Sequence, residues 1–163
     1  MAMANTVTLE VTEAAARALL RDYAYALDDG RLADWPSFFA EACLYRITTR
    51  QNRERGYPLS IMLCENRAML YDRVEATEKA NIYEPHFYRH ILSDGQVLGH
   101  EGGALTMRTS FICVRTMLDG GMLLFAAGEY VDEIVVGAGR CLFRSKIVVL
   151  DPSRIDTLIA IPL

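Results

Sequence analysis

The last third of the chain, residues 105–163, carries the pattern that most restricts the fold. Runs of β-branched, aromatic and aliphatic residues are divided there by short turn sequences at 119–121, 137–139 and 151–153. Turns of this length and composition join neighbouring antiparallel strands. The pattern therefore predicts a meander of four consecutive strands, which the earlier part of the chain must cover.

The charges within these runs predict how the strands face. In the run 140–147, basic side chains alternate with apolar ones, which is typical of a strand with one wet face. Glu129 and Glu133 lie four residues apart in the preceding run and therefore point to the same face of that strand, so a neighbouring strand sets them opposite Arg144 or Lys146. Such cross-strand pairs contribute about 0.2–1 kcal/mol each. We expect Arg144 and Lys146 to lie on the surface.

Two segments, 122–127 and 147–150, are apolar at both odd and even positions, so both faces of each strand must be covered. The apolar fraction of the chain, 52%, lies above the range of about 45–50% for a soluble domain. No run of apolar residues reaches the length of a membrane span. The excess therefore indicates a large core or a subunit interface, and we expect an oligomer.

Length and charge limit the class of protein. A chain of 163 residues predicts one domain over 1–163, with 1–9 as a loose N-terminal arm. The net charge of −4, spread along the chain, argues against nucleic acid or an anionic membrane as the partner. The start lacks the basic and apolar regions of a secretion signal, and the four cysteines are far apart. These features predict a cytoplasmic, reduced protein.

Helices are predicted in the first half of the chain. Apolar residues recur at helical spacing over 10–28, and Gly30 is placed to end that helix in a left-handed conformation. Asp34 is a candidate N-cap for a short helix that carries an aromatic cluster of Trp35, Phe38 and Phe39. A third helix is predicted over 65–79.

Short strands are predicted over 43–48 and 58–64, with a loop or hairpin over 49–57. Residues 81–92 lead into the sheet, and His100 lies in a glycine-rich surface loop. Helices that precede a run of strands are typical of an α+β domain. Glycines at positions where strands must bend favour a curved, mostly antiparallel sheet with the helices packed in its concave face.

His86 and His90, with Glu84 or Asp94, form the most suggestive metal motif. Two histidines four residues apart share a face if the segment is helical, but Pro85 interrupts a helix there. The cysteines lack the close spacing of an iron–sulfur site. We therefore expect these histidines to be satisfied by hydrogen bonds, and the chain to bind neither a metal nor a cofactor.

General acid–base catalysis is a second candidate chemistry. Tyr25, Asp28, Asp29, His86 and His90 converge if the helix end and the curved sheet form a cone, and a buried carboxylate–histidine pair has shifted pKa values. The alternative is that the two aspartates are solvated carboxylates at a helix end. The spacing in the sequence does not decide between the two.

Several motifs resemble those of known families. The opening of the chain looks like that of the cone-shaped NTF2-like families, in the motifs 25–30, Trp35, 38–39 and 43–46. A narrower resemblance, to the small β subunits of terephthalate- and salicylate-type aromatic-ring-hydroxylating dioxygenases, comes from the motifs 81–84, 88–92, 125–130 and 156–163. It extends over nearly the whole chain and is weakest over 96–107.

The resemblance to dioxygenase β subunits implies a structural, non-catalytic role. In that family a catalytic α subunit holds the Rieske [2Fe–2S] cluster and the mononuclear Fe(II), and the electrons come from NAD(P)H through a reductase. The usual assembly is an α3β3 hexamer; the sequence leaves open whether this chain alone forms a β homotrimer or another oligomer. Aromatic compound catabolism is the implied process.

The resemblance also implies a candidate α-facing surface in the arginine–histidine segment: Tyr83, His86, Tyr88, Arg89 and His90. The alternative is that Arg89 and His90 close the edge of the core. Two other functions remain open: a free-standing NTF2-like isomerase or dehydratase with Asp28 as base and His90 as acid, and a ligand-binding or dimerising module without chemistry.

Overall fold

One curved sheet organises the chain. The computed structural model describes residues 11–80, 83–155 and 157–163, so the arm predicted over 1–9 lies outside the described residues. The sheet has seven strands in the order β2-β1-β7-β6-β5-β3, and β4 pairs with β5 beside this path. All neighbours are antiparallel except β1 and β7, which are parallel.

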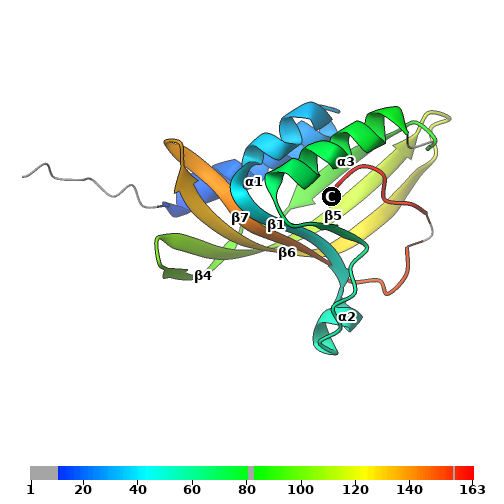
Figure 1. Ribbon diagram of the computed structural model, residues 1–163. Coiled ribbons are helices and arrows are strands. Elements are labelled where there is room, and N and C mark those ends of the chain that lie inside the picture. The colour runs from blue at the N-terminus through cyan, green and yellow to red at the C-terminus, as the bar shows by residue number, and fades with distance from the viewer. Residues whose placement is uncertain (1–10, 81–82, 156) are drawn as a thin grey trace, which may run out of the picture.

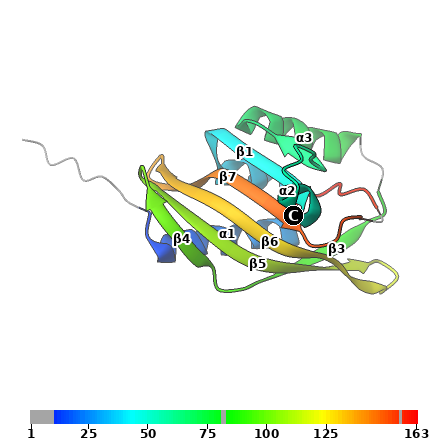
Figure 2. The same ribbon diagram turned by 90° about the horizontal axis from the view of Figure 1, so that it is seen from below.

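The strands are β1 (Phe39–Thr49), β2 (Met62–Cys64), β3 (His86–Leu92), β4 (Gln96–Glu101), β5 (Ala104–Met117), β6 (Met122–Gly137) and β7 (Arg140–Leu150). The helices are α1 (Glu13–Asp28), the 3-10 helix η1 (Leu32–Phe38), α2 (Arg50–Glu54) and α3 (Arg67–Lys79). Helices α1 and α3 lie on one side of the sheet (Figure 1), and the view from below shows the strands in front of α1 (Figure 2). The predicted α+β class is confirmed.

The ends of α1 follow from local chemistry. The Thr12 side chain accepts a hydrogen bond from the Ala15 N–H, which satisfies a free donor of the first turn. At the other end Gly30 has φ +71°, its N–H donates to the Leu27 carbonyl, and the Arg31 N–H donates to the Ala26 carbonyl. This pair of bonds is a Schellman motif, which requires a left-handed residue. The predicted role of Gly30 is confirmed.

The short helix differs from its prediction. It is the 3-10 helix η1, which begins at Leu32, so Asp34 lies inside it and is not its N-cap. The Asp34 carboxylate instead accepts a hydrogen bond from Arg31. Packing sets this register, because the fully buried Trp35 ring contacts Tyr45 edge-on, with 5.0 Å between ring centroids.

Two further segments differ from their predictions. The loop predicted over 49–57 contains the helix α2, whose N-cap is the Thr49 hydroxyl accepting from the Asn52 N–H. The surface loop predicted around His100 is the strand β4, which pairs with the first half of β5 while β3 pairs with the second half. Glycine-rich segments carry a weak strand signal, and here the partner strand supplies the hydrogen bonds.

Three of the four predicted meander strands form, as β5, β6 and β7, and the described residues after 153 contain no strand. The parallel strand β1 already occupies the free edge of β7, so the chain has no edge left to join there. The last segment instead runs back over the helical side and buries Leu163 completely.

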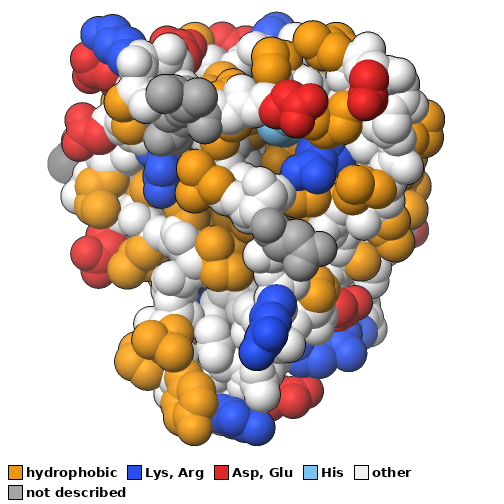
Figure 3. Space-filling view, turned by 90° about the vertical axis from the view of Figure 1, so that its right-hand side faces the viewer, with side chains coloured by type: hydrophobic (Ala, Val, Ile, Leu, Met, Phe, Trp, Pro, Cys, Tyr) orange, Lys and Arg blue, Asp and Glu red, His pale blue; other side chains and the backbone are white. Residues whose placement is uncertain are grey.

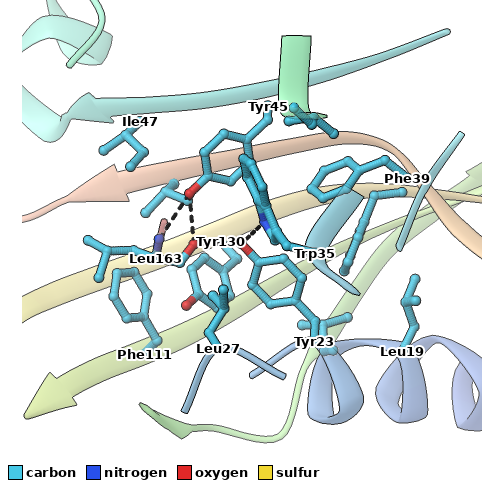
Figure 4. Close-up of a cluster of buried hydrophobic side chains, with 14 of the residues drawn as sticks. Leu19, Tyr23, Leu27, Trp35, Phe39, Tyr45, Ile47, Phe111, Tyr130 and Leu163 are labelled. Carbon is cyan, nitrogen blue, oxygen red and sulfur yellow. Dashed lines mark hydrogen bonds between the residues drawn. The ribbon is translucent and has the colours of Figure 1, made fainter. Parts of the chain in front are cut away.

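An aromatic cluster fills the space between the helices and the inner face of the sheet (Figure 4). The Tyr45 hydroxyl accepts a hydrogen bond from the Leu163 N–H at 3.0 Å and donates to the Leu163 main-chain oxygen at 3.0 Å. The Tyr23 hydroxyl donates to the same oxygen at 2.8 Å and accepts from the Trp35 indole N–H at 3.3 Å. Polar atoms at the centre of the core therefore satisfy one another.

The two segments predicted to be covered on both faces have different outcomes. In 147–150, Val148, Val149 and Leu150 are buried, as expected. In 122–127 the first residues are exposed, and Met122 keeps 69% of its surface accessible. Within the described residues, none of the helices combines the length and apolar character needed to cross a bilayer.

Replacing Tyr45 by phenylalanine tests the hydrogen bonds at the centre of the core. Tyr45→Phe removes the acceptor of the Leu163 N–H and one donor to its main-chain oxygen, so we expect a loss of about 1–3 kcal/mol in the free energy of unfolding. Urea denaturation measures it. Tyr25→Phe on the exposed face of α1 is the matched control and should change stability by less than about 0.5 kcal/mol. Equal effects of the two substitutions would contradict the assignment.

Candidate functional site

Asp28 and His90 are brought together, as the acid–base hypothesis requires. The His90 Nδ1 lies 2.6 Å from Asp28 Oδ1, and the His90 main-chain N–H donates to Asp28 Oδ2 at 2.9 Å. A carboxylate oxygen that is not protonated accepts hydrogen bonds, so in this contact the proton lies on Nδ1. Both carboxylate oxygens are therefore occupied by one residue of β3.

The position of this pair follows from the topology. Asp28 is the last residue of α1, and β3 is the edge strand of the sheet. The Ser93 N–H donates to the Ser110 carbonyl on β5. Because the main-chain groups of successive residues in a strand point to opposite sides, those of His90, three residues earlier, point away from β5. Asp28 thus binds the free edge of β3 and fastens the end of the helix to it.

Solvent does not reach the Asp28–His90 pair. The exposed fractions of the two side chains are 2% and 0%, and the His90 Nε2 is buried without a hydrogen-bond partner in the described structure. The other three predicted residues do not converge on it: Tyr25 and Asp29 are exposed, and His86 Nδ1 lies 2.8 Å from the Glu84 main-chain oxygen. The polar atoms of the pair are therefore shielded from bulk solvent, although both residues border a cavity.

The candidate metal motif does not assemble. His86 and His90 share a face because β3 is a strand with a period of two, not because the segment is helical. Each ring has its own oxygen partner, and Asp94 pairs with Arg17 at 2.7 Å. In residues 11–80, 83–155 and 157–163, no three histidine, cysteine or acidic side chains lie together as a group able to hold a metal.

The cysteines are unsuited to nucleophilic chemistry. Burial raises the pKa of the Cys43 thiol to about 11 and that of the Cys113 thiol to about 12, so both are protonated at neutral pH. Cys64 is also buried, and Cys141 is partly so. These residues pack as small apolar side chains.

A buried ion pair, Lys146 with Asp132, was missed by the sequence analysis. The Lys146 Nζ lies 3.2 and 3.3 Å from the two Asp132 oxygens, and both side chains are fully buried. The same ammonium lies 3.5 Å from the ring centroid of Tyr130, 4.5 Å from that of Tyr23 and 4.6 Å from that of Phe143. Cation–π contacts therefore supplement the single carboxylate.

A β-bulge explains the error over Lys146. Glu133 pairs with Ser145 and Ile134 with Phe143, so Arg144 is an extra residue that reverses the alternation of β7. Arg144 stays outside and donates to Glu133 through two of its guanidinium nitrogens, Nε and Nη2, which confirms that predicted pair. Lys146, two residues later, turns into the core.

Burial shifts the pKa values of the ion pair toward the neutral forms. Desolvation lowers the pKa of Lys146 to about 8, although the attraction of Asp132 opposes the change. Desolvation also raises the pKa of Asp132 to about 6, against the attraction of Lys146. Both side chains therefore gain or lose a proton closer to neutral pH than an exposed aspartate or lysine does.

A cavity of about 430 Å³ lies between α1 and β3. Its floor is apolar and includes Leu20, Ala24 and Met107. Its rim carries the ion pair of Arg17 with Asp94. Asp28 and His90 border the cavity; the Asp28 carboxylate faces His90 Nδ1, while His90 Nε2 is buried without a hydrogen-bond partner in the described structure.

The predicted α-facing residues divide between the two faces of β3. Tyr88 and His90 are buried on the inner face, and the His86 ring packs against Tyr88 with 4.8 Å between the ring centroids. Arg89 points to the outer face and is exposed, and Tyr83, before the strand, is also exposed. Of the five, only Tyr83 and Arg89 are exposed.

The outer face around Arg89 is apolar. Strand pairing sets three rows of three residues across β3, β5 and β6, and we name them the outer-face patch: Phe87, Thr116 and Met122; Arg89, Val114 and Leu124; Ile91, Ile112 and Ala127. Arg89 is the one charged residue among the nine. Five large apolar members are exposed: Phe87, Ile91, Ile112, Met122 and Leu124. Apolar surface of this extent marks a contact with another molecule.

Comparison with known proteins identifies the family. The family described as "Ring hydroxylating beta subunit" matches residues 22–157, most of the chain. The chain belongs to this family. The predicted resemblance to dioxygenase β subunits is thereby confirmed.

Named relatives of this β subunit include dioxygenase components. It is 36% identical over 137 residues to the small subunit of anthranilate 1,2-dioxygenase from Burkholderia cepacia, covering 84% of this chain and 85% of the relative. It is also 36% identical over 141 residues to subunit beta 1 of the terminal oxygenase component of terephthalate 1,2-dioxygenase from a Comamonas species, covering 86% and 92%.

A solved structure shares the fold of this β subunit. The β subunit of a putative aromatic-ring-hydroxylating dioxygenase from Novosphingobium aromaticivorans superposes with a TM-score of 0.84 at 35% identity, covering 93% of this chain and 96% of the other. The predicted NTF2-like fold is confirmed.

Removing one member of the buried ion pair should damage the β subunit more than removing both. Lys146→Met leaves the Asp132 carboxylate buried and unpaired, so we expect a loss of about 3–5 kcal/mol in the free energy of unfolding. The double variant Asp132→Leu/Lys146→Met removes both desolvated charges and should recover most of that loss. Urea denaturation of the wild type, both single variants and the double variant measures the coupling. Additive losses would show that the two side chains act independently.

The same variants predict a pH dependence. Between about pH 8 and 10 the unfolded chain keeps the Lys146 proton that the folded chain has released, so the stability of the wild type should rise with pH relative to the double variant. Between about pH 4 and 6 the folded chain keeps the Asp132 proton that the unfolded chain has lost, so the relative stability should fall as the pH rises. Denaturation at pH 4.5, 7 and 9.5 tests both signs. A difference that is constant across this range would contradict the shifts.

Proposed function

We propose that this chain is the structural, non-catalytic β subunit of a Rieske-type aromatic-ring-hydroxylating dioxygenase in cytoplasmic aromatic compound catabolism. The observation that carries the proposal is the outer-face patch in a member of the ring-hydroxylating β-subunit family. A chain that folds around its own complete core and still exposes a three-strand apolar face needs a partner to cover that face.

The proposed partner is the catalytic α subunit, in an α3β3 assembly. It holds the Rieske [2Fe–2S] cluster and the mononuclear Fe(II), and a reductase supplies electrons from NAD(P)H. The names of the relatives, "small subunit" and "subunit beta" of a terminal oxygenase component, support a companion subunit. Within the patch, the exposed Arg89 is the proposed polar contact with α, and Tyr83 lies beside the same strand.

The Asp28–His90 contact favours a second candidate, the free-standing isomerase or dehydratase. The pair has the geometry of an acid–base couple, with 2.6 Å between the carboxylate and the imidazole. It is sealed from solvent, however, and both carboxylate oxygens hold β3 in place. We infer that the pair is a structural clasp between α1 and the edge of the sheet.

Co-expression with the α subunit of an aromatic-ring-hydroxylating dioxygenase tests the proposal. We expect the two chains to co-purify in equal proportion and to hydroxylate an aromatic acid when the reductase and NAD(P)H are added. The chain purified alone should be inactive on the same substrate. Size-exclusion chromatography with light scattering gives the stoichiometry, and product formation gives the activity.

Two results would argue against the proposal. One is that the co-expressed chains purify separately. The other is that the chain alone turns over a small-molecule substrate and that Asp28→Asn abolishes the turnover while the protein stays folded. That second result would establish the isomerase or dehydratase reading.

A further inference from the structure

The cavity between α1 and β3 has the size and the lining of a small-molecule site. Its volume of about 430 Å³ lies within the range of about 300–1,000 Å³ that is typical of ligand pockets. The apolar side chains visible in Figure 3 lie on the open surface of one end of the molecule. Those on the floor of the cavity are instead enclosed: the exposed fractions of Leu20, Ala24 and Met107 are 3%, 6% and 0%. An enclosed apolar floor favours an apolar ligand.

Two polar atoms of the lining residues have no hydrogen-bond partner in the described structure. They are His90 Nε2 and Thr109 Oγ1. The exposed fraction is 0% for the His90 side chain and 1% for Thr109, so bulk solvent does not pair with them. Asp28 holds the His90 ring through Nδ1, which fixes the direction of Nε2. Buried polar atoms without a partner destabilise a fold, so a ligand group that pairs with both is bound favourably.

The wall around Thr109 combines a fixed part with a flexible one. The Met107 sulfur and the Thr109 hydroxyl oxygen lie 2.5 and 2.9 Å from the position that a β carbon on Gly95 would take, so the two atoms are neighbours. The Gly95 main-chain oxygen accepts a hydrogen bond from Arg17 Nη2 at 3.2 Å, which ties this wall to α1. Met107 is the flexible part, because its side chain is unbranched and turns about three bonds.

A hydroxyl group suits both unpaired atoms. The Nε2 atom accepts a hydrogen bond when the His90 ring is neutral and donates one when the ring is charged, and the Thr109 hydroxyl does either. A ligand hydroxyl also donates and accepts, whereas a carboxylate only accepts and would bring a further charge into the buried site. The sulfur of Met107 makes favourable contacts with aromatic rings. These preferences together describe an aromatic ring that carries a hydroxyl group.

We propose that the cavity between α1 and β3 binds a phenol. The ring packs on the apolar floor, and the hydroxyl group pairs with His90 Nε2 and Thr109 Oγ1. Because solvent does not reach either atom in this structure, the ligand turns the Met107 side chain aside as it enters. The cavity thus holds a ligand without any chemical step.

The inference goes beyond the proposed function and does not depend on it. All of the contact residues belong to this chain, and none is a member of the outer-face patch. Two patch residues, Arg89 and Ile91, border the same cavity, but the proposed contacts do not involve them. The purified full chain is therefore sufficient for the test, and its result is separate from that of co-expression with an α subunit.

Two ligands of the same shape test the role of the hydroxyl group. p-Cresol carries a hydroxyl group where p-xylene carries a methyl group, and both are neutral at pH 7. Isothermal titration calorimetry should show one p-cresol site in each chain. We expect p-xylene to bind about tenfold more weakly or less, because it leaves the two buried polar atoms unpaired.

Two substitutions test the assigned residues. Thr109→Val keeps the shape of the side chain and removes its hydroxyl group, so it should weaken p-cresol binding by about three- to tenfold and leave p-xylene binding unchanged. Ala24→Leu fills part of the cavity and should weaken the binding of both ligands by about tenfold or more. The matched controls are Thr106→Val, on the outer face of β5, and Ala14→Leu, on the exposed side of α1; both should bind like the wild type.

The melting temperature separates ligand binding from folding. Thr109→Val replaces a buried hydroxyl group that has no partner in the described structure by a methyl group, so its melting temperature should equal or exceed that of the wild type. Weaker p-cresol binding by a variant that is at least as stable identifies a ligand contact rather than a structural one.

Three results would overturn the proposal. The first is that the wild type binds neither ligand at millimolar concentration. The second is that it binds p-cresol and p-xylene equally well, since the hydroxyl group would then have no partner in the site. The third is that Thr109→Val and Ala24→Leu bind p-cresol like the wild type, which would place the ligand elsewhere.

Discussion

The structure depends on the hydrogen bonds that join Tyr45 and Tyr23 to Leu163. They connect β1, α1 and the last residue of the chain at the centre of an aromatic core. Without them, the end of the chain would leave buried main-chain groups unpaired on the concave side of the sheet. Because the returning segment is held there, it covers part of the concave side of the sheet.

The helices and the returning segment lie on the concave face of the sheet, whereas the outer face is exposed. The two long helices lie on one face of the sheet, so the opposite face of β3, β5 and β6 remains apolar and uncovered. In a β-subunit family member this face is the natural place for a partner, since its rows of large apolar side chains surround a single arginine. Arg89 is the charged residue of this face.

The charged groups inside the protein connect secondary structure elements. Asp28 uses both oxygens to hold the main chain and side chain of His90, which fixes α1 to the free edge of β3. Lys146 and Asp132 join β7 to β6 behind three aromatic rings. Each pair has the composition of a catalytic site, but its side chains are buried and bind each other. Their effect is on geometry and on the pH dependence of stability.

The sequence by itself determined the features that depend on neighbouring residues. Gly30 ends α1 because a left-handed residue is needed there, and the turns of the meander follow from glycine and aspartate at fixed positions. The family motifs and the apolar excess also pointed to a subunit with a partner.

Only the tertiary structure decided the features that depend on contacts between distant residues. A bulge at Arg144 turned Lys146 into the core, and the parallel strand β1 took the edge that a fourth meander strand required. The burial of His90 against Asp28 likewise depends on two residues that are 62 positions apart. A pattern along the chain could not predict these features, because it carries no information about which strand edge is already occupied.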